Sequence, residues 1–307
     1  MRGAQAALAL AVVYFAGRKL AGEWGEVRRA AVSLSPRWSL VVASCVMVFI
    51  VYAILIEVWR IVLTGWRARL RYRDASRIWI ISNLGKYVPG KVWQFGAMMM
   101  MAQQRGVSGV AAGGSAILTT LTATVVGFAV VAITGSRVLP IPTAGLVAIW
   151  IVGAGLLVLP TLLPRFGRVA SRVTGRSIVL PPLAPSVMLR IIAGTALSWC
   201  VYGLAFQVLA LGLLGHAAGS SLVYIAVFTG SYLLGFIAVF APGGLVVREG
   251  AMFAALVKFG FDPGAAVVLA VASRLWLTVL EILPALVFLL IRPLQRQHWV
   301  AAEKDLP

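Results

Sequence analysis

The sequence has few acidic residues, cysteines and histidines, and each shortage excludes a class of function. Nine Asp and Glu residues among 307 leave little for paired acid–base catalysis. The two histidines, His216 and His298, have no carboxylate or cysteine at metal-ligand spacing, so we expect no metal site. Cys45 and Cys200 lie in apolar runs and are expected to be small buried hydrophobes. We therefore expect a protein that is not an enzyme and that needs no cofactor.

The sequence is also short of charge overall. Charged residues make up 12% of the chain, about half the share in a typical soluble domain, whereas 61% of the residues are hydrophobic. Several apolar runs reach the roughly 20 residues that span a bilayer as a helix. The composition therefore predicts an all-α, polytopic membrane helix bundle with about six to eight membrane segments.

The charges that are present are mostly positive. The formal net charge is +18, from 27 basic and 9 acidic residues. The basic residues gather in short loops at residues 60–77 and 165–176, which by the positive-inside rule we assign to the cytoplasm. Such loops also attract anionic headgroups. We expect membrane lipids as partners and no nucleic acid, in a multi-pass protein of the cell (inner) membrane.

The apolar runs divide the chain into two transmembrane halves. Residues 1–37 are predicted to form a membrane helix and an interfacial segment, although the first apolar run is also as short as a signal-peptide core. The first half is predicted at residues 38–163 and the second at 191–292. Between them we expect a basic cytoplasmic linker at 164–190, and after them a cytoplasmic tail at 293–307.

Each half contains one hydrophobic segment that is interrupted by Pro-Gly and by charges. The interruptions read NLGKYVPGKVWQ at residues 83–94 and APGGLVVREG at residues 241–250. In contact with lipid, irregular backbone would leave unsatisfied N–H and C=O groups, so such breaks are tolerated where protein buries them or where they line a polar cavity. A break in each half is typical of a transporter built from two related halves.

The charge pattern also predicts how the broken segments are arranged. Three full crossings between the two basic loops would place the loops on opposite sides of the membrane. Both loops are cytoplasmic if residues 78–101 enter and return on that side. Arg292 is cytoplasmic as well if residues 221–259 enter and return from the other side. We therefore predict two re-entrant hairpins in an inverted repeat, supported by the placement of the breaks rather than by residue identity. The positive charge of residues 17–37 fits this topology poorly.

The first interruption has the chemistry of an anion site. Free N–H groups after Pro89 would bind an anion, and Lys86 and Lys91 would add point charges suited to phosphate. Alternatively, the lysines snorkel to headgroups and Tyr87 and Trp93 form an aromatic belt. We favour binding, because the segment is more polar than an anchor requires. The predicted substrate-binding residues here are Asn83, Lys86, Tyr87, Pro89, Gly90, Lys91 and Gln94.

The second interruption offers an arginine and a glycine-rich turn. Its glycines permit a tight turn that exposes backbone N–H groups. Arg248 can donate two hydrogen bonds to a phosphate, and Glu249 can neutralise Arg248 or take up a coupling proton. The alternative is an Arg–Glu pair in an external loop. The predicted binding residues are Pro242, Gly243, Gly244, Arg248 and Glu249.

The last apolar run contains two charges at helical spacing. Arg274 and Glu281 are seven residues apart, about two helical turns, so they share one face. Charges at such depth usually face the bundle interior or a water-filled cavity, although a purely structural buried pair is the alternative. We add both residues to the predicted substrate site.

At these residues the chain resembles the lysylphosphatidylglycerol synthase transmembrane family, also called flippase-like integral membrane proteins. The resemblance rests on both interruptions in the right order and covers roughly residues 38–292. It implies an inner-membrane protein that moves lipids or lipid-linked substrates between leaflets. In full-length synthases a separate cytoplasmic domain transfers the aminoacyl group from tRNA; this chain stops shortly after its last span, so we do not expect that activity. The resemblance implies roles for Lys86, Pro89, Gly90, Lys91, Arg248 and Glu249.

These observations favour a carrier that translocates an anionic lipid or a polyprenyl-phosphate-linked substrate. One alternative is a non-transporting scaffold whose basic loops, residues 60–77 and 165–176, dock a separate cytoplasmic lipid- or glycan-modifying enzyme. Another is a membrane-embedded lipid-modifying enzyme, which the scarcity of paired carboxylates, histidines and metal ligands disfavours. Replacement of loop arginines would abolish the function of a scaffold, whereas a carrier would depend on the interruptions.

Overall fold

In the computed structural model the regular structure of the described residues is entirely helical. The described residues are 36–88, 92–135, 143–175, 180–216, 218–238, 244 and 246–290. Among them, five helices are long and apolar enough to cross a membrane. The predicted all-α membrane bundle is therefore confirmed. The five long helices are α2 (Trp38–Gly65), α5 (Gly109–Gly135), α6 (Thr143–Thr174), α7 (Pro185–Leu214) and α10 (Pro263–Leu290).

The remaining helices are short and form two hairpins. Hairpin A consists of α3 (Tyr72–Asn83), the 3₁₀ turn η1 (Leu84–Tyr87) and α4 (Trp93–Gln103); hairpin B consists of α8 (Ser221–Ile237) and α9 (Val247–Lys258). The 12 residues of α3 rise about 18 Å, well short of the ~30 Å hydrocarbon core. The two halves of each hairpin pack against each other. The chain reverses direction between Tyr87 and Trp93 in hairpin A and between Ile237 and Val247 in hairpin B.

The open end of each hairpin is closed by a contact between its two halves. In hairpin A, Asp74 on the first turn of α3 forms a 3.5 Å ion pair with Arg105, just after α4. In hairpin B, the ring of Tyr224 near the start of α8 lies 5.7 Å from that of Phe261, just after α9. Each hairpin therefore returns to the end of the bundle from which it entered.

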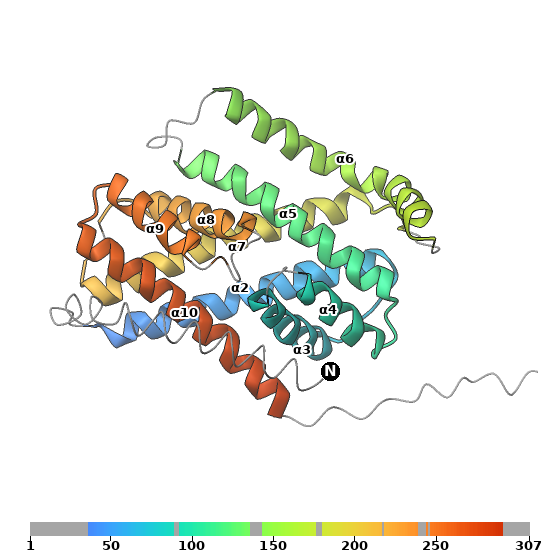
Figure 1. Ribbon diagram of the computed structural model, residues 1–307, viewed down its shortest axis with the longest axis horizontal. Helices are drawn as coiled ribbons and strands as arrows, with labels where there is room; N and C mark the ends of the chain where they lie inside the picture. The colour runs from blue at the N-terminus through green and yellow to red at the C-terminus, as the bar shows by residue number, and fades with distance from the viewer. Residues whose placement is uncertain are drawn as a thin grey trace, which may run out of the picture.

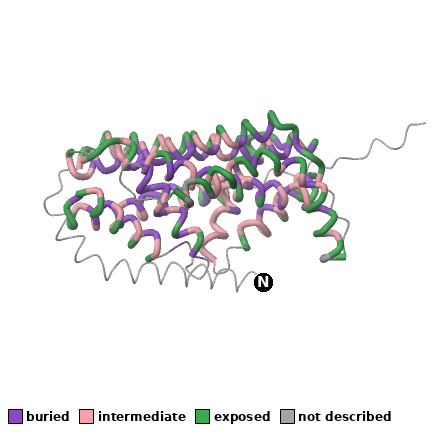
Figure 2. The backbone as a smooth tube through the Cα atoms, turned by 90° about the horizontal axis from the view of Figure 1, so that it is seen from above, coloured by how far each residue is buried: buried purple, intermediate pink, exposed green. Residues whose placement is uncertain are grey.

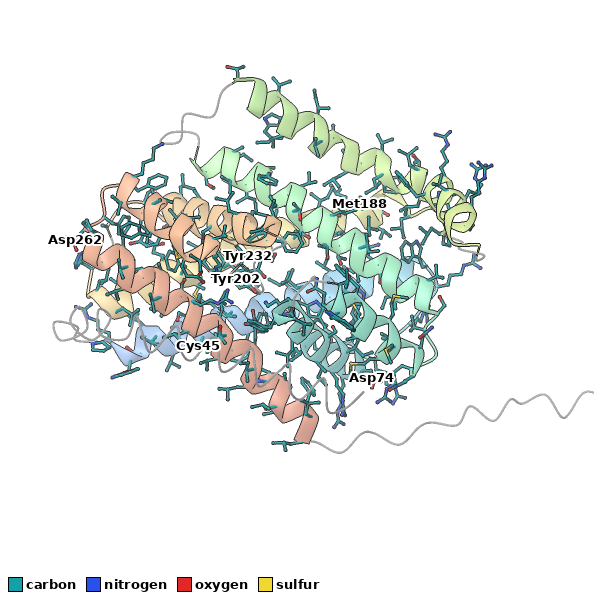
Figure 3. The ribbon with its side chains drawn as sticks, in the orientation of Figure 1. Cys45, Asp74, Met188, Tyr202, Tyr232 and Asp262 are labelled. Carbon is teal, nitrogen blue, oxygen red and sulfur yellow. The ribbon has the colours of Figure 1, made fainter. Side chains whose placement is uncertain are left out.

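The two hairpins enter from opposite ends of the bundle. Helices α2 and α7 are antiparallel, because the Arg37 N–H donates to the Gly212 carbonyl while the Trp66 indole donates to the Pro181 carbonyl at the other end. Hairpin A follows the end of α2 and hairpin B follows the end of α7 (Figure 1). Accordingly, Asp74 and Asp262, which mark the two open ends, lie on opposite sides of the molecule in Figure 3.

The helices form two units with the same order and opposite direction. The first is α2, hairpin A and α5; the second is α7, hairpin B and α10, and α6 joins them. Hairpin A packs against α10 of the second unit through α3, while hairpin B packs against α5 of the first through α8. This exchange places both hairpins between the units, in the arrangement of an inverted repeat.

The interior lies between these units, and α6 lies at the edge. At least half of the most apolar 18-residue stretch of α7, and of that of α10, is buried. The corresponding share for α6 is 17%. Figure 2 shows buried residues along the inward sides of the helices and exposed residues on the outward sides. Large apolar side chains such as Trp150 and Ile151 are exposed on α6. The outward face suits a hydrocarbon solvent rather than water.

Several helices extend into segments that the sequence analysis expected to be loops. Helix α2 continues to Gly65 and α3 begins at Tyr72, so residues 66–71 alone separate them where a loop was expected at 60–77. Helix α6 likewise continues past Pro160 and Pro164 into the expected linker. The apolar pattern ends where lipid contact ends, whereas backbone hydrogen bonding continues beyond it. Residues 1–35 of the expected N-terminal segment at 1–37, and the expected tail at 293–307, lie outside the described residues.

Gly203 provides a test of the contact between α7 and α8. A Cβ atom on Gly203 would lie 2.4 Å from the Cα of Ile225, so Gly203→Ala forces the two backbones apart. We expect it to lower the free energy of unfolding by about 1–3 kcal/mol. Gly155 on α6 has open space around it, so Gly155→Ala should be neutral or stabilising by up to about 1 kcal/mol. Equilibrium unfolding in mixed micelles measures both, and equal effects would contradict this packing.

Candidate functional site

A central cavity of about 220 Å³ lies where the tips of the two hairpins approach each other. Its wall also includes residues of α2, α5, α7 and α10. Tyr232, which lines it from α8, lies near the middle of the bundle together with Tyr202 (Figure 3). The cavity brings together the predicted residues Asn83, Lys86, Tyr87, Gln94, Arg248, Arg274 and Glu281.

The tip of hairpin A is fixed to α10 by one carboxylate. The ammonium of Lys86 donates to Oε1 of Glu281 at 2.6 Å, and the hydroxyl of Tyr87 donates to Oε2 at 2.6 Å. Glu281 is 6% exposed, so this is a buried ion pair with both carboxylate oxygens engaged. Lys86 thus points into the bundle, and the snorkelling alternative does not describe it. Gly85 allows η1 to approach α4 closely, because a Cβ at this position would lie 2.5 Å from the backbone nitrogen of Gln94.

The tip of hairpin B presents a buried arginine. Arg248, in the first turn of α9, is 5% exposed, and its guanidinium lies 5.3 Å from the ring centroid of Phe228 and 5.1 Å from that of Tyr232. Its Nε and Nη2 atoms have no hydrogen-bond partner among the described residues. The aromatic rings offset only part of the cost of burying a charge. Arg248 therefore holds strong donors at the cavity wall that an anion would satisfy.

Glu249 pairs with Arg274 rather than with Arg248. Its Oε1 lies 3.6 Å from Nη1 of Arg274, an ion-pair distance beyond hydrogen-bond length. The guanidinium of Arg274 also lies 5.8 Å from the ring centroid of Tyr87. Arg274 thus contacts both hairpin tips. Arg274 lines the cavity, whereas Glu249 does not. The expectation that Glu249 neutralises Arg248 is not met, and the pair does not lie in an exposed loop.

The described charges around the cavity leave an excess of one positive charge. Lys86, Arg248 and Arg274 contribute three cations, and Glu249 and Glu281 contribute two carboxylates. Each carboxylate is already within ion-pair distance of Lys86 or Arg274, so Arg248 is the cation left without a counter-charge within the described part of the site. In surroundings of low dielectric such a charge attracts an anion strongly.

Gly244 shapes the turn that precedes α9 and does not line the cavity. It has φ of +71°, and a Cβ there would lie 2.7 Å from the carbonyl oxygen of Gly235. Glycine is therefore required at position 244, because a larger residue could not pack so closely against α8. The other predicted residues of the two turns, Pro89, Gly90, Lys91, Pro242 and Gly243, lie outside the described residues.

These features agree with the comparison to known proteins. The family model described as the lysylphosphatidylglycerol synthase TM region matches residues 4–285, most of the chain. The chain belongs to this family. No curated protein matches it. Membership of the lysylphosphatidylglycerol synthase TM family, together with the five long apolar helices, makes this a multi-pass membrane protein of a lipid-related family, whose surroundings are membrane lipids.

The structure adds cavity residues that the sequence analysis did not select. Thr120 and Thr124 on α5 donate to carbonyls one turn earlier, at 2.8 and 2.9 Å, so their oxygens keep lone pairs that can accept from a ligand. Threonine is common in membrane helices, and only its repetition within residues 119–124 was a signal. The additional polar and aromatic lining residues include Trp79, Thr119, Thr120, Thr124, Thr195, Trp199, Tyr232 and Thr278.

A double-mutant cycle tests the bond between hairpin A and α10. Glu281→Met leaves Lys86 buried without a counter-ion, and we expect a loss of about 3–5 kcal/mol in the free energy of unfolding. The double variant Lys86→Met, Glu281→Met removes both charges and should be closer to the wild type than Glu281→Met alone. Unfolding in mixed micelles measures the wild type, the single variants Glu281→Met and Lys86→Met, and the double variant. Losses that add without coupling would show that the two charges do not interact.

Proposed function

We propose that this protein translocates an anionic lipid, or a lipid-linked substrate that carries phosphate, between the leaflets of the membrane. The observation that carries the proposal is Arg248, a buried guanidinium at the cavity wall with two donors unused among the described residues. A phosphate accepts two parallel hydrogen bonds from a guanidinium and would neutralise its charge. The excess positive charge around the cavity favours such a headgroup over a neutral one.

The inverted units supply a way to expose this site to either end. The cavity lies between hairpin tips that come from opposite ends, and each tip contacts α10 through one ion pair: Lys86 with Glu281, and Glu249 with Arg274. In transporters built of inverted repeats, one repeat moves against the other around a central site. A phosphate at Arg248 would compete with Glu249 for Arg274, so binding would loosen hairpin B from α10. In this proposal the headgroup itself triggers the change of access.

The two carboxylates beside the cavity have different partners. Glu281 accepts from Lys86 and from Tyr87. Neither carboxylate oxygen of Glu249 has a hydrogen-bond donor among the described residues, and its Oε1 lies 3.6 Å from Nη1 of Arg274. We propose that Glu249 or Glu281 takes up a coupling proton.

Leaflet exchange in liposomes tests the proposed transport. We expect the purified protein to exchange a labelled anionic phospholipid or polyprenyl phosphate, and Arg248→Met to lower the rate by about 10- to 100-fold, because a hydrogen bond to a charged group contributes ~1.5–3 kcal/mol. Arg248→Lys should retain part of the rate, since it keeps the charge without the planar fork. Arg248→Met should unfold no more easily than the wild type, because it removes an uncompensated buried charge.

Arg69→Ala is the matched control. Arg69 is an exposed arginine between α2 and α3, outside the cavity. A carrier should tolerate its loss in liposomes. A scaffold would instead lose activity in cells when Arg69 and its exposed neighbour Arg71 are replaced, and would tolerate Arg248→Met. Absence of exchange for every lipid tried, by protein shown to be folded, would refute the proposed transport.

A further inference from the structure

A second cavity, of about 250 Å³, lies between hairpin B and α5. Its wall includes Phe128 and Val131 of α5, Gly230 and Leu234 of α8, Ala255 of α9, and Phe259 just after α9. The hydroxyl of Ser231 is the polar side-chain group among its lining residues, and it donates to the carbonyl of Phe228 on its own helix. The space is much larger than one water needs and offers water few partners, so it suits hydrocarbon.

This apolar cavity adjoins the central cavity. Leu233 lines both spaces and is itself buried, so the two cavities share this side chain in their walls. On the other side, Leu234 is 51% exposed at the surface of the bundle, where lipid would lie. A molecule with a charged head and a hydrocarbon chain would therefore find a place for each part in adjoining cavities.

The apolar cavity also has a direction. It runs from Leu233, near the tip of hairpin B, to Phe259, near its open end. A lipid with its head at Arg248 and its chain in this space points its tail toward the end where α2 begins and α7 ends. Lipids of the opposite leaflet have this orientation, and that leaflet adjoins the exposed Arg67, Arg69 and Arg71 between α2 and α3.

We infer that the apolar cavity is the binding site for the hydrocarbon chain of the transported lipid, and that the lipid enters from the leaflet beside residues 66–71. The inference rests on the proposed function for the place of the headgroup. The bundle then holds the chain along hairpin B while the head lies at mid-depth.

Photo-crosslinking tests the chain site without relying on transport. The probe is phosphatidylglycerol with a photoreactive group halfway along one acyl chain, presented in vesicles. We expect adducts within residues 226–234 and 251–259, and faster adduct formation when the probe is added to the leaflet beside residues 66–71. Adducts concentrated on the outer face of α6, as for bulk lipid, would overturn the inference.

Gly230→Leu is the variant that fills the proposed chain site. A Cβ on Gly230 would lie 3.8 Å from Val131, an ordinary contact, so the leucine extends into the cavity without displacing backbone. We expect it to reduce adducts and leaflet exchange by about tenfold, the scale on which an apolar pocket discriminates by size. Gly155→Leu, on the exposed face of α6, is the matched control and should leave both unchanged.

The two assays separate the chain site from the proposed function. If exchange requires Arg248 while Gly230→Leu crosslinks and exchanges as the wild type does, the chain site is refuted and transport stands. If no lipid is exchanged but adducts form in hairpin B and disappear in Gly230→Leu, transport is refuted and the chain site stands.

Discussion

The structure depends on the neutralisation of buried charge at the ends of broken helices. Each hairpin stops at mid-depth, where neither water nor headgroups can satisfy its polar groups. Helix α10 supplies the partners: Glu281 accepts from the tip of hairpin A, and Arg274, two turns earlier on the same face, lies at ion-pair distance from Glu249 of hairpin B. One continuous helix thus determines where two discontinuous ones end, and Arg248 is left as the cation without a counter-charge among these residues.

The surrounding packing serves the same constraint. The antiparallel contact of α2 and α7 places the two units face to face, and each hairpin packs on the last helix of the other unit. Gly203 lets α7 lie close to α8, and Gly244 lets the turn before α9 lie close to α8. These close contacts allow apolar helices to enclose the polar tips. The aromatic rings of Phe228 and Tyr232 then cover the guanidinium of Arg248, which has no ionic partner among the described residues. Apolar packing and buried charge are therefore parts of one arrangement.

Much of this arrangement was predictable from residue types, and its details were not. Pro-Gly within apolar segments predicted both breaks, and the seven-residue spacing of Arg274 and Glu281 predicted their common face. The partner of Glu249 was not predictable, because adjacent residues on a helix point in different directions and the rotation of α9 is set by packing. Helix ends were missed since hydropathy follows lipid contact and not hydrogen bonding. The threonines of α5 escaped notice because single hydroxyls satisfy themselves on the preceding turn.

Of the five long helices, α6 contributes least to the interior. It nevertheless determines the direction of the second unit relative to the first. A unit of span, hairpin and span begins and ends at the same end of the bundle, because its two spans cross in opposite senses and its hairpin returns to where it entered. Two such units joined directly would run in the same direction, with both hairpins opening at one end. One additional crossing reverses the second unit. The parity of crossings between the repeats, rather than any contact that α6 makes, is what sets the two tips facing each other.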